Sequence, residues 1–264
     1  MKFIIDHDLH IHSQLSSCSS DPEQTTERIL EYAKNAGLKQ ICLTDHYWDE
    51  NVEGASNWYK PQNYAHIKEA CPLPQDENCR FLFGCETDMD RFYKIGIPKE
   101  RYDDFDFIIV PTTHLHMKGF TYLEEQNTVE EKIRLYVERF EAFLKADLPF
   151  RKVGIAHLTC SLIMKEDGNY LKVLDGISDG TFERLFKECA EKGCGIELNM
   201  PLGVSKTEYK ETMLRPYRIA KAQGCKFYLG SDAHHPSGLD GAVSRFTEFV
   251  DALDLQESDK FHIG

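Results

Sequence analysis

The chain has 264 residues, 41% hydrophobic and 28% charged, an ordinary globular composition that excludes a wholly disordered protein. Its formal net charge of −13, without any Lys/Arg block, argues against an extended nucleic-acid surface but not against a small anionic ligand. The apolar run at the N-terminus is too short for a signal peptide, and no stretch approaches the roughly 18 apolar residues of a membrane helix, so we expect no membrane association and a cytoplasmic protein.

Short apolar runs alternate with longer amphipathic ones along the whole chain. The apolar runs predict buried parallel strands at residues 2–5, 40–43, 80–83, 107–110, 152–155, 195–198 and 226–229. The amphipathic runs predict helices at residues 22–36, 128–144, 179–192, 210–223 and 239–253. This alternation predicts βαβ units in a single α/β domain over residues 1–264, with long loops at 47–64 and 117–127 that we place at the functional end.

Almost every predicted strand leads directly into side chains that bind metal ions. In chain order these are Asp8, His10 and His12; Asp45 and His46; Glu86; His114 and His116; His157; Glu197 and Asn199; and Asp232 and His234. The carboxyl ends of the strands of a parallel barrel meet on one face, which holds the active site. We therefore expect these side chains to meet there.

The spacing and chemistry of this set indicate the kind of metal site. His10 and His12 are two residues apart, so on an extended segment both side chains lie on one face and can bind one ion. Nitrogen and oxygen ligands favour zinc, manganese or iron over calcium. A carboxylate such as Glu86 can bridge two ions, and metal pairs about 3.5–4 Å apart suit in-line displacement at phosphorus.

Together these motifs resemble the PHP family, named for polymerase and histidinol phosphatase. The resemblance runs from residue 8 to residue 235, through the segments DLHIHS, SD (Ser20-Asp21), TDH, GCE, TH, AH and GSDAH. It implies a distorted (β/α)7 TIM-like barrel with up to three divalent ions (Zn, Mn or Fe). The implied ligands are His10, His12, Glu86 and Asp232 for the first ion, Glu86, His114 and His157 for the second, and Asp21, His46 and His234 for the third.

One part of the third site departs from the family pattern. Histidinol phosphatases often carry a histidine where this chain has Cys18, so either Cys18 or Asp21 would complete the site. Asp21 also precedes a predicted helix start, and a helix N-cap is the competing interpretation of this residue.

Other residues near the strand ends are candidates for the chemistry itself. Asp45 precedes a ligand, and it would orient His46 or, less in keeping with its position, protonate the leaving group. The candidate substrate contacts are His116 and Asn199, with the cations Lys118, Lys206 and Arg215 as candidate phosphate contacts.

The function that the resemblance implies is metal-dependent hydrolysis of a small phosphomonoester. Histidinol phosphate, an intermediate of histidine biosynthesis, is the leading named substrate, because the chain length and layout resemble the stand-alone histidinol phosphatases. A nucleotide or oligonucleotide phosphoesterase is the alternative within the family. An amidohydrolase-type barrel and a non-catalytic metal-binding module are the alternatives outside it.

Overall fold

A computed structural model shows a parallel sheet that curves almost into a closed barrel; it describes residues 1–264 except 20, 167, 201–202 and 205–207. The strands are β1 (His7–Ile11), β2 (Gln40–Leu43), β3 (His46–Tyr47), β4 (Arg80–Thr87), β5 (Phe107–Ile109), β6 (Val153–Ile155), β7 (Gly195–Leu198) and β8 (Lys226–Leu229). Their order around the sheet is β1-β2-β4-β5-β6-β7-β8, with β3 beside the far end of β4.

The barrel closes through the residues that follow β8. The Asp232 N–H donates to the His10 carbonyl at 2.8 Å, and the His12 N–H donates to the Ala233 carbonyl at 3.0 Å. We call this junction between β1 and the segment after β8 the seam. The buried Asp8 carboxylate stabilises the seam by accepting from the Ser231 N–H at 2.9 Å. Two stretches of candidate ligands are therefore held together by their own backbones.

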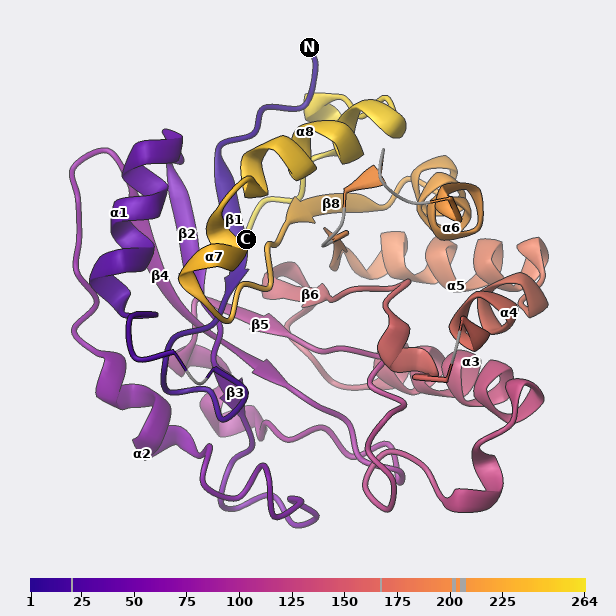
Figure 1. Ribbon diagram of the computed structural model, residues 1–264. Coiled ribbons are helices and arrows are strands. Elements are labelled where there is room, and N and C mark those ends of the chain that lie inside the picture. Colours follow the sequence, from indigo (N-terminus) through magenta and orange to yellow (C-terminus); the bar gives the residue numbers. More distant parts are fainter. Residues whose placement is uncertain (20, 167, 201–202, 205–207) are drawn as a thin grey trace.

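Helices surround the strands, and the long ones follow the predicted pattern. Figure 1 shows α1 and α2 at the left of the strands, α8 at the top and α3 to α6 at the right. The helices are α1 (Thr26–Ala36), α2 (Tyr64–Ile67), α3 (Val129–Lys145), α4 (Asn169–Gly176), α5 (Asp179–Lys192), α6 (Lys210–Ala222), α7 (Pro236–Leu239) and α8 (Ala242–Ala252). No helix in the described part of the chain is long and apolar enough to cross a membrane.

The interior of the barrel is filled at the end away from the candidate ligands. Phe107, Tyr228 and Phe261 pack there with Leu9 and other apolar side chains. The C-terminal segment lies along β8, where the Phe261 N–H donates to the Phe227 carbonyl at 2.7 Å. Because this end is packed, the open end of the barrel is the one that carries the candidate ligands.

The structure confirms the α/β barrel and corrects some element boundaries. The first strand is β1 (His7–Ile11) rather than 2–5, because the buried pairing partners belong to the histidine segment, whereas Ile4 is 45% exposed. Helix α1 begins at Thr26 rather than at residue 22, since the Thr25 hydroxyl accepts from the Arg28 N–H as its N-cap. The short elements β3, α2, α4 and α7 were not predicted.

Candidate metal centre

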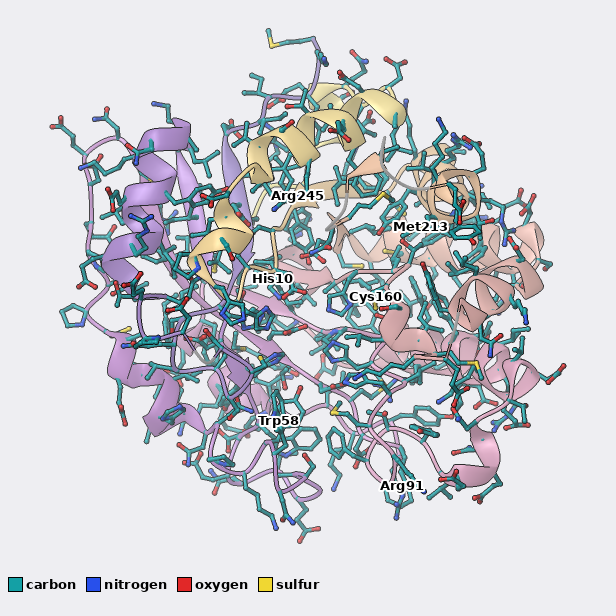
Figure 2. All side chains as sticks on the ribbon, viewed as in Figure 1. His10, Trp58, Arg91, Cys160, Met213 and Arg245 are labelled. Carbon is teal, nitrogen blue, oxygen red and sulfur yellow. The ribbon has the colours of Figure 1, made fainter. Side chains whose placement is uncertain are left out.

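Eight of the nine predicted ligands converge at the open end of the barrel, where His10 lies near the centre of the view (Figure 2). Three groups of donor atoms lie within 4.8 Å of one another. They are His10, His12 and Glu86; Glu86, His114 and His157; and His12, His46 and His234. The side chains come from β1, β3, β4 and the segments after β5, β6 and β8, so the closed barrel assembles the cluster.

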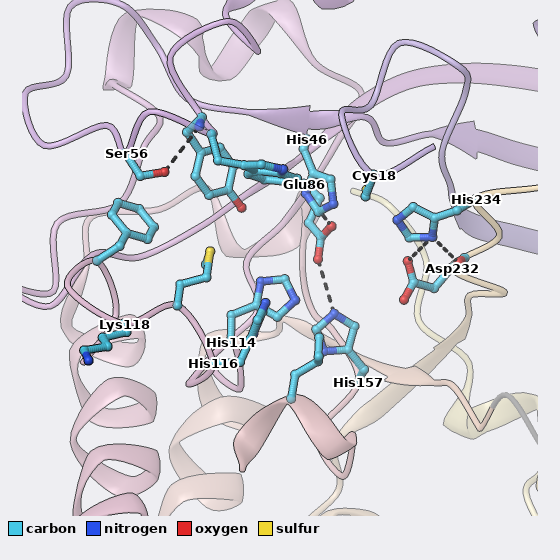
Figure 3. A pocket seen from close by; sticks show the side chains of 15 residues that line it. Cys18, His46, Ser56, Glu86, His114, His116, Lys118, His157, Asp232 and His234 are labelled. Atoms are coloured by element: carbon cyan, nitrogen blue, oxygen red, sulfur yellow. Dashed lines mark hydrogen bonds and ion pairs between the residues drawn. The ribbon is translucent and has the colours of Figure 1, made fainter. Parts of the chain in front are cut away.

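Glu86 lies at the centre of this cluster (Figure 3). Its Oε2 is 3.5 Å from His10 Nε2, 3.4 Å from His12 Nε2 and 3.0 Å from His46 Nδ1, and its Oε1 is 3.3 Å from His157 Nε2. A tetrahedral ion with bonds of about 2.1 Å separates its ligand atoms by about 3.4 Å. The donor atoms around Glu86 therefore have the spacing that a metal ion requires, and each carboxylate oxygen faces a different group.

Asp232 completes the first group from the other side. Its Oδ1 lies 3.4 Å from His10 Nε2 and 3.2 Å from His12 Nε2. The backbone at Asp232 has a φ of 52° and that at His157 a φ of 33°, in the left-handed region that residues with a Cβ rarely adopt. Strained backbone of this kind is typical of functional sites, where the surrounding structure holds it in place.

Hydrogen bonds fix the orientation of five of the histidine rings. In each ring Nδ1 lies 2.5–3.0 Å from a fixed acceptor: Glu197 for His10, Ser16 for His12, Asp88 for His114, Thr113 for His157 and the Asp232 carbonyl for His234. A ring that donates its Nδ1–H in this way presents the lone pair of Nε2 to the cluster. This is the arrangement found around histidine ligands of metals.

His46 provides an independent test of the fit to a cation. Its Nδ1 is buried and makes no hydrogen bond, although Glu86 Oε2 is only 3.0 Å away. Buried polar atoms of native proteins are seldom left without a partner, and an ion is one of the partners that explains such an atom. The residues present therefore fit a bound divalent metal.

The electrostatics of the cluster also favour a cation. Burial raises the pKa of a carboxyl group, but the surrounding histidines outweigh it and hold the pKa of Glu86 well below its usual value. Burial lowers the pKa of His10, but the charges of Glu197, Asp232 and Glu86 outweigh it and raise that pKa well above the usual value. The centre of the site is thus a concentration of carboxylate charge with little access to water.

A cavity of about 540 Å³ opens above the cluster (Figure 3). Its floor includes Glu86, His157 and Asp232, and its walls include Trp58, Phe120 and other side chains of the two long loops. This volume suits a small-molecule ligand.

Comparison with known proteins agrees with this geometry. The profile of the PHP domain matches residues 8–201, which is most of the chain. The chain belongs to the PHP domain family. The candidate ligands Asp232 and His234 lie beyond the matched residues, and the contacts described above bring them to the cluster.

A solved structure has the same fold over almost its full length. It is described as histidinol phosphate phosphatase (HISK) from Lactococcus lactis subsp. lactis Il1403 complexed with ZN, L-histidinol and phosphate. It has a TM-score of 0.60 and 17% sequence identity, and the alignment covers 97% of this chain and 98% of that one. No curated protein matches the sequence.

The PHP barrel of this chain does not bring Asp21 into the cluster. The Asp21 carboxylate accepts from the Glu23 N–H at 2.9 Å in a tight turn, and Asp21 belongs to none of the three donor groups. It is not the N-cap of α1 either, since Thr25 has that role. Cys18 lines the cavity, but its thiol is also outside the three groups. In the third group, His12 takes the place predicted for Asp21.

Asp45 contacts two serines beside the histidine cluster. It accepts from the Ser13 N–H at 2.7 Å, from the Ser13 hydroxyl at 2.6 Å and from the Ser16 hydroxyl at 2.7 Å. Ser16 in turn contacts His12 Nδ1 and receives the His46 N–H. Asp45 is buried and does not line the cavity, so the structure supports orientation of His12 through Ser16 and not proton transfer to a leaving group.

Asn199, a predicted substrate contact, lies away from the cavity, whereas Glu197 contacts the histidines of the cluster. The Asn199 amide donates to the Gly230 carbonyl at 3.2 Å, and the residue does not line the cavity. The buried Glu197 carboxylate lies 2.5 Å from His10 Nδ1 and accepts from the His157 N–H at 2.7 Å. It therefore connects a ligand of the first group with a ligand of the second.

Some of the other predicted substrate contacts line the cavity, and others do not. His116 and Lys118 line the cavity, and Lys118 lies at the opposite side from Asp232 and His234 (Figure 3). Arg215 is not brought there, because its guanidinium pairs with Asp179 and donates to backbone carbonyls at the end of α4. Lys206, like Ser20 beside Asp21, lies outside the described residues.

Proposed function

We propose that the protein is a metal-dependent phosphoesterase that hydrolyses a small phosphomonoester. The observation that supports this most directly is the arrangement of three donor groups around Glu86 at the floor of one cavity. His10, His12, Glu86 and Asp232 would hold one ion, and Glu86, His114 and His157 a second. His46 and His234 would hold a third together with a further ligand. When bound, divalent ions neutralise the phosphoryl oxygens and activate the attacking water.

The residues of the chain contribute orientation and exclusion of water. Glu197, Asp88, Ser16 and Thr113 fix the histidine rings, so the ligands need no reorganisation when substrate binds. The loop side chains that line the cavity reduce the access of water to the cluster, which strengthens electrostatic interactions there. His116, whose ring lies 5.3 Å from that of His114, is placed to contact the substrate beside the second group.

Histidinol phosphate is the first named compound to test. The structural neighbour is described with zinc, L-histidinol and phosphate, and it shares the fold over nearly its whole length. At 17% identity the substrate does not carry over with the fold, so nucleotides and other phosphomonoesters belong in the same panel.

The experiment that tests the proposal is a comparison of metal-loaded wild-type protein with the double variant His10→Ala/His12→Ala. Loaded with zinc or manganese, the wild type should release phosphate from at least one phosphomonoester, and the double variant should lose this turnover together with bound metal. His262→Ala, an exposed histidine away from the cluster, is the matched control and should behave like the wild type. Unchanged turnover in the double variant would rule out the scheme.

A further inference from the structure

The two long loops at the open end of the barrel build a part of the cavity that the metal centre does not use. The loop of residues 48–63, between β3 and α2, contributes Ser56, Trp58 and Tyr59 to the lining. The segment of residues 115–123, after His114, contributes His116, Met117, Lys118 and Phe120. None of these side chains belongs to the three donor groups, so they surround whatever part of the substrate extends beyond the phosphate.

Trp58 lies directly beside the cluster. Its ring centroid lies 4.9 Å from that of His46, and it packs edge-on against Tyr59 at 4.7 Å. Tyr59 is itself buried against Trp48 and Phe120, which belong to one apolar cluster. Trp58 keeps 37% of its surface exposed. A rigid, buried aromatic base therefore holds an indole ring beside the metal-binding residues with part of its surface free.

The charges around the cavity limit what can lie against this ring. Among the described residues, the carboxylates that line it are Glu86 and Asp232, and both belong to the metal centre. Lys118, the lysine of the lining, is an exposed residue that pairs with Glu124 outside the cavity. A buried ammonium group without a carboxylate partner is costly, whereas an uncharged ring loses little on leaving water.

We propose that the leaving group of the substrate carries a flat, uncharged aromatic or heteroaromatic ring that packs against Trp58 while the phosphate lies on the metal cluster. This inference rests on the proposed phosphoesterase function and specifies its substrate class. A planar ring matches the indole face and excludes water from it, and stacking of this kind does not depend on a particular pattern of hydrogen bonds. Aromatic faces also attract cations, so a cationic leaving group is the competing occupant.

A series of alkyl phosphates with matched leaving alcohols tests the ring. The compounds are 2-phenylethyl phosphate, 2-cyclohexylethyl phosphate and 2-(piperidin-4-yl)ethyl phosphate, which differ in planarity and charge but little in the reacting bond. We expect kcat/KM for the phenyl compound to exceed that of the piperidinium compound by about tenfold or more, with the cyclohexyl compound between them. Equal values, or a preference for the piperidinium compound, would overturn the inference.

Histidinol phosphate also tests whether an uncharged leaving group is preferred. Its imidazole ring fits the proposal, but its ammonium group has no carboxylate partner among the described residues of the cavity. The analogue that lacks the amino group should therefore be hydrolysed at least as efficiently as histidinol phosphate. A clear preference for histidinol phosphate would contradict the uncharged class.

Variants of Trp58 test the residue directly. Trp58→Ala should raise KM for 2-phenylethyl phosphate by about tenfold with little change in kcat, and Trp58→Phe should restore most of the loss. Because Trp58 is partly exposed, neither variant should change metal content or the melting temperature. An unchanged KM in Trp58→Ala would overturn the assignment.

A binding measurement separates this inference from the proposed function. Zinc-loaded protein is titrated with 3-phenylpropylphosphonate, which cannot be hydrolysed, and calorimetry should show binding that Trp58→Ala weakens by about tenfold. If binding depends on Trp58 but no phosphomonoester is turned over, the proposed function fails and the ring site stands. If phosphomonoesters are turned over without any dependence on Trp58, the ring site fails and the proposed function stands.

Discussion

Three histidines of the cluster in this PHP domain, His10, His114 and His157, are held by partners that are distant in the sequence, and this decides what could be predicted at the residue scale. The candidate ligands themselves could be named from the sequence, because they follow apolar strands in an ordered series. The residues that orient them could not, since Glu197 is 187 positions from His10 and the pairing depends on closure of the barrel. Asp88, which contacts His114 and Arg139, could not be predicted either, because it lies in a segment with no distinct motif.

Glu197→Gln should weaken metal binding without removing any ligand. The amide is the same size but loses the negative charge that faces His10 Nδ1, so the ring is held less firmly and its basicity falls. Changes at such partners typically cost about 10- to 100-fold in metal affinity or activity. Zinc affinity, measured by competition with a chromophoric chelator, is the appropriate measurement.

Glu191→Gln, an exposed change near the end of α5, makes a matched control for Glu197→Gln. It should leave the zinc affinity unchanged. If both variants bind zinc like the wild type, Glu197 has no role in positioning the ligand.

Asp45→Asn distinguishes orientation from acid catalysis. If Asp45 acts by holding Ser13 and Ser16, the variant should lower kcat/KM by a similar factor for good and poor leaving groups. A general acid would instead matter most for the poorest leaving groups. A comparison of aryl and alkyl phosphates measures this, and a loss confined to alkyl phosphates would restore Asp45 as the acid.

At the scale of elements, α3 acts as a support for the loops that carry ligands. Its buried Arg139 pairs with Asp88 at 3.1 Å and donates to the Met89 and Thr112 carbonyls, and its buried Lys132 donates to the Leu115 carbonyl at 2.6 Å. The periodicity of the sequence predicted this helix within one residue at each end. It could not predict that two cations of the helix are buried, because their partners, the Asp88 carboxylate and several backbone carbonyls, have positions that depend on the fold.

Lys132 makes stability depend on pH in a defined direction. Burial lowers its pKa from 10.5 to about 8, so between these values the unfolded chain binds more protons than the folded one. The free energy of unfolding that this group contributes therefore rises with pH across this window. Urea unfolding should show the difference between wild type and Lys132→Met shifting in favour of the wild type from about pH 7 to about pH 10. A constant difference would show that Lys132 titrates normally.

On the scale of the whole molecule, the alternation of strands and helices predicted the parallel α/β sheet, and the family resemblance implied that it forms a barrel. Strands β2, β7 and β8 have the predicted boundaries, and the parallel order follows from short strands separated by helices. The seam between β1 and the segment after β8 was not predicted, since it is formed by backbone groups of the ligand motifs themselves. The aromatic loop around Trp58 was expected at the functional end, but no periodicity indicated how its rings pack.

Metal should stabilise the whole barrel, because its ligands come from both sides of the seam. A ligand present at about 100 times its Kd, and bound only by the folded state, raises the free energy of unfolding by about 2.7 kcal/mol. We expect zinc or manganese to raise the melting temperature of chelator-treated protein, and His10→Ala to lose this shift. Equal melting temperatures with and without metal would contradict a site built across the seam.

The position of the seam also has a consequence for biogenesis. Because His10 and Asp232 come from opposite ends of the sequence, a ribosome has to release most of the polypeptide before the first group of ligands exists. Pairing of such distant segments is slow compared with formation of local helices. The first group of donor atoms would therefore form only after translation has passed β8, whereas the residues of the second group, Glu86, His114 and His157, are all translated before that strand.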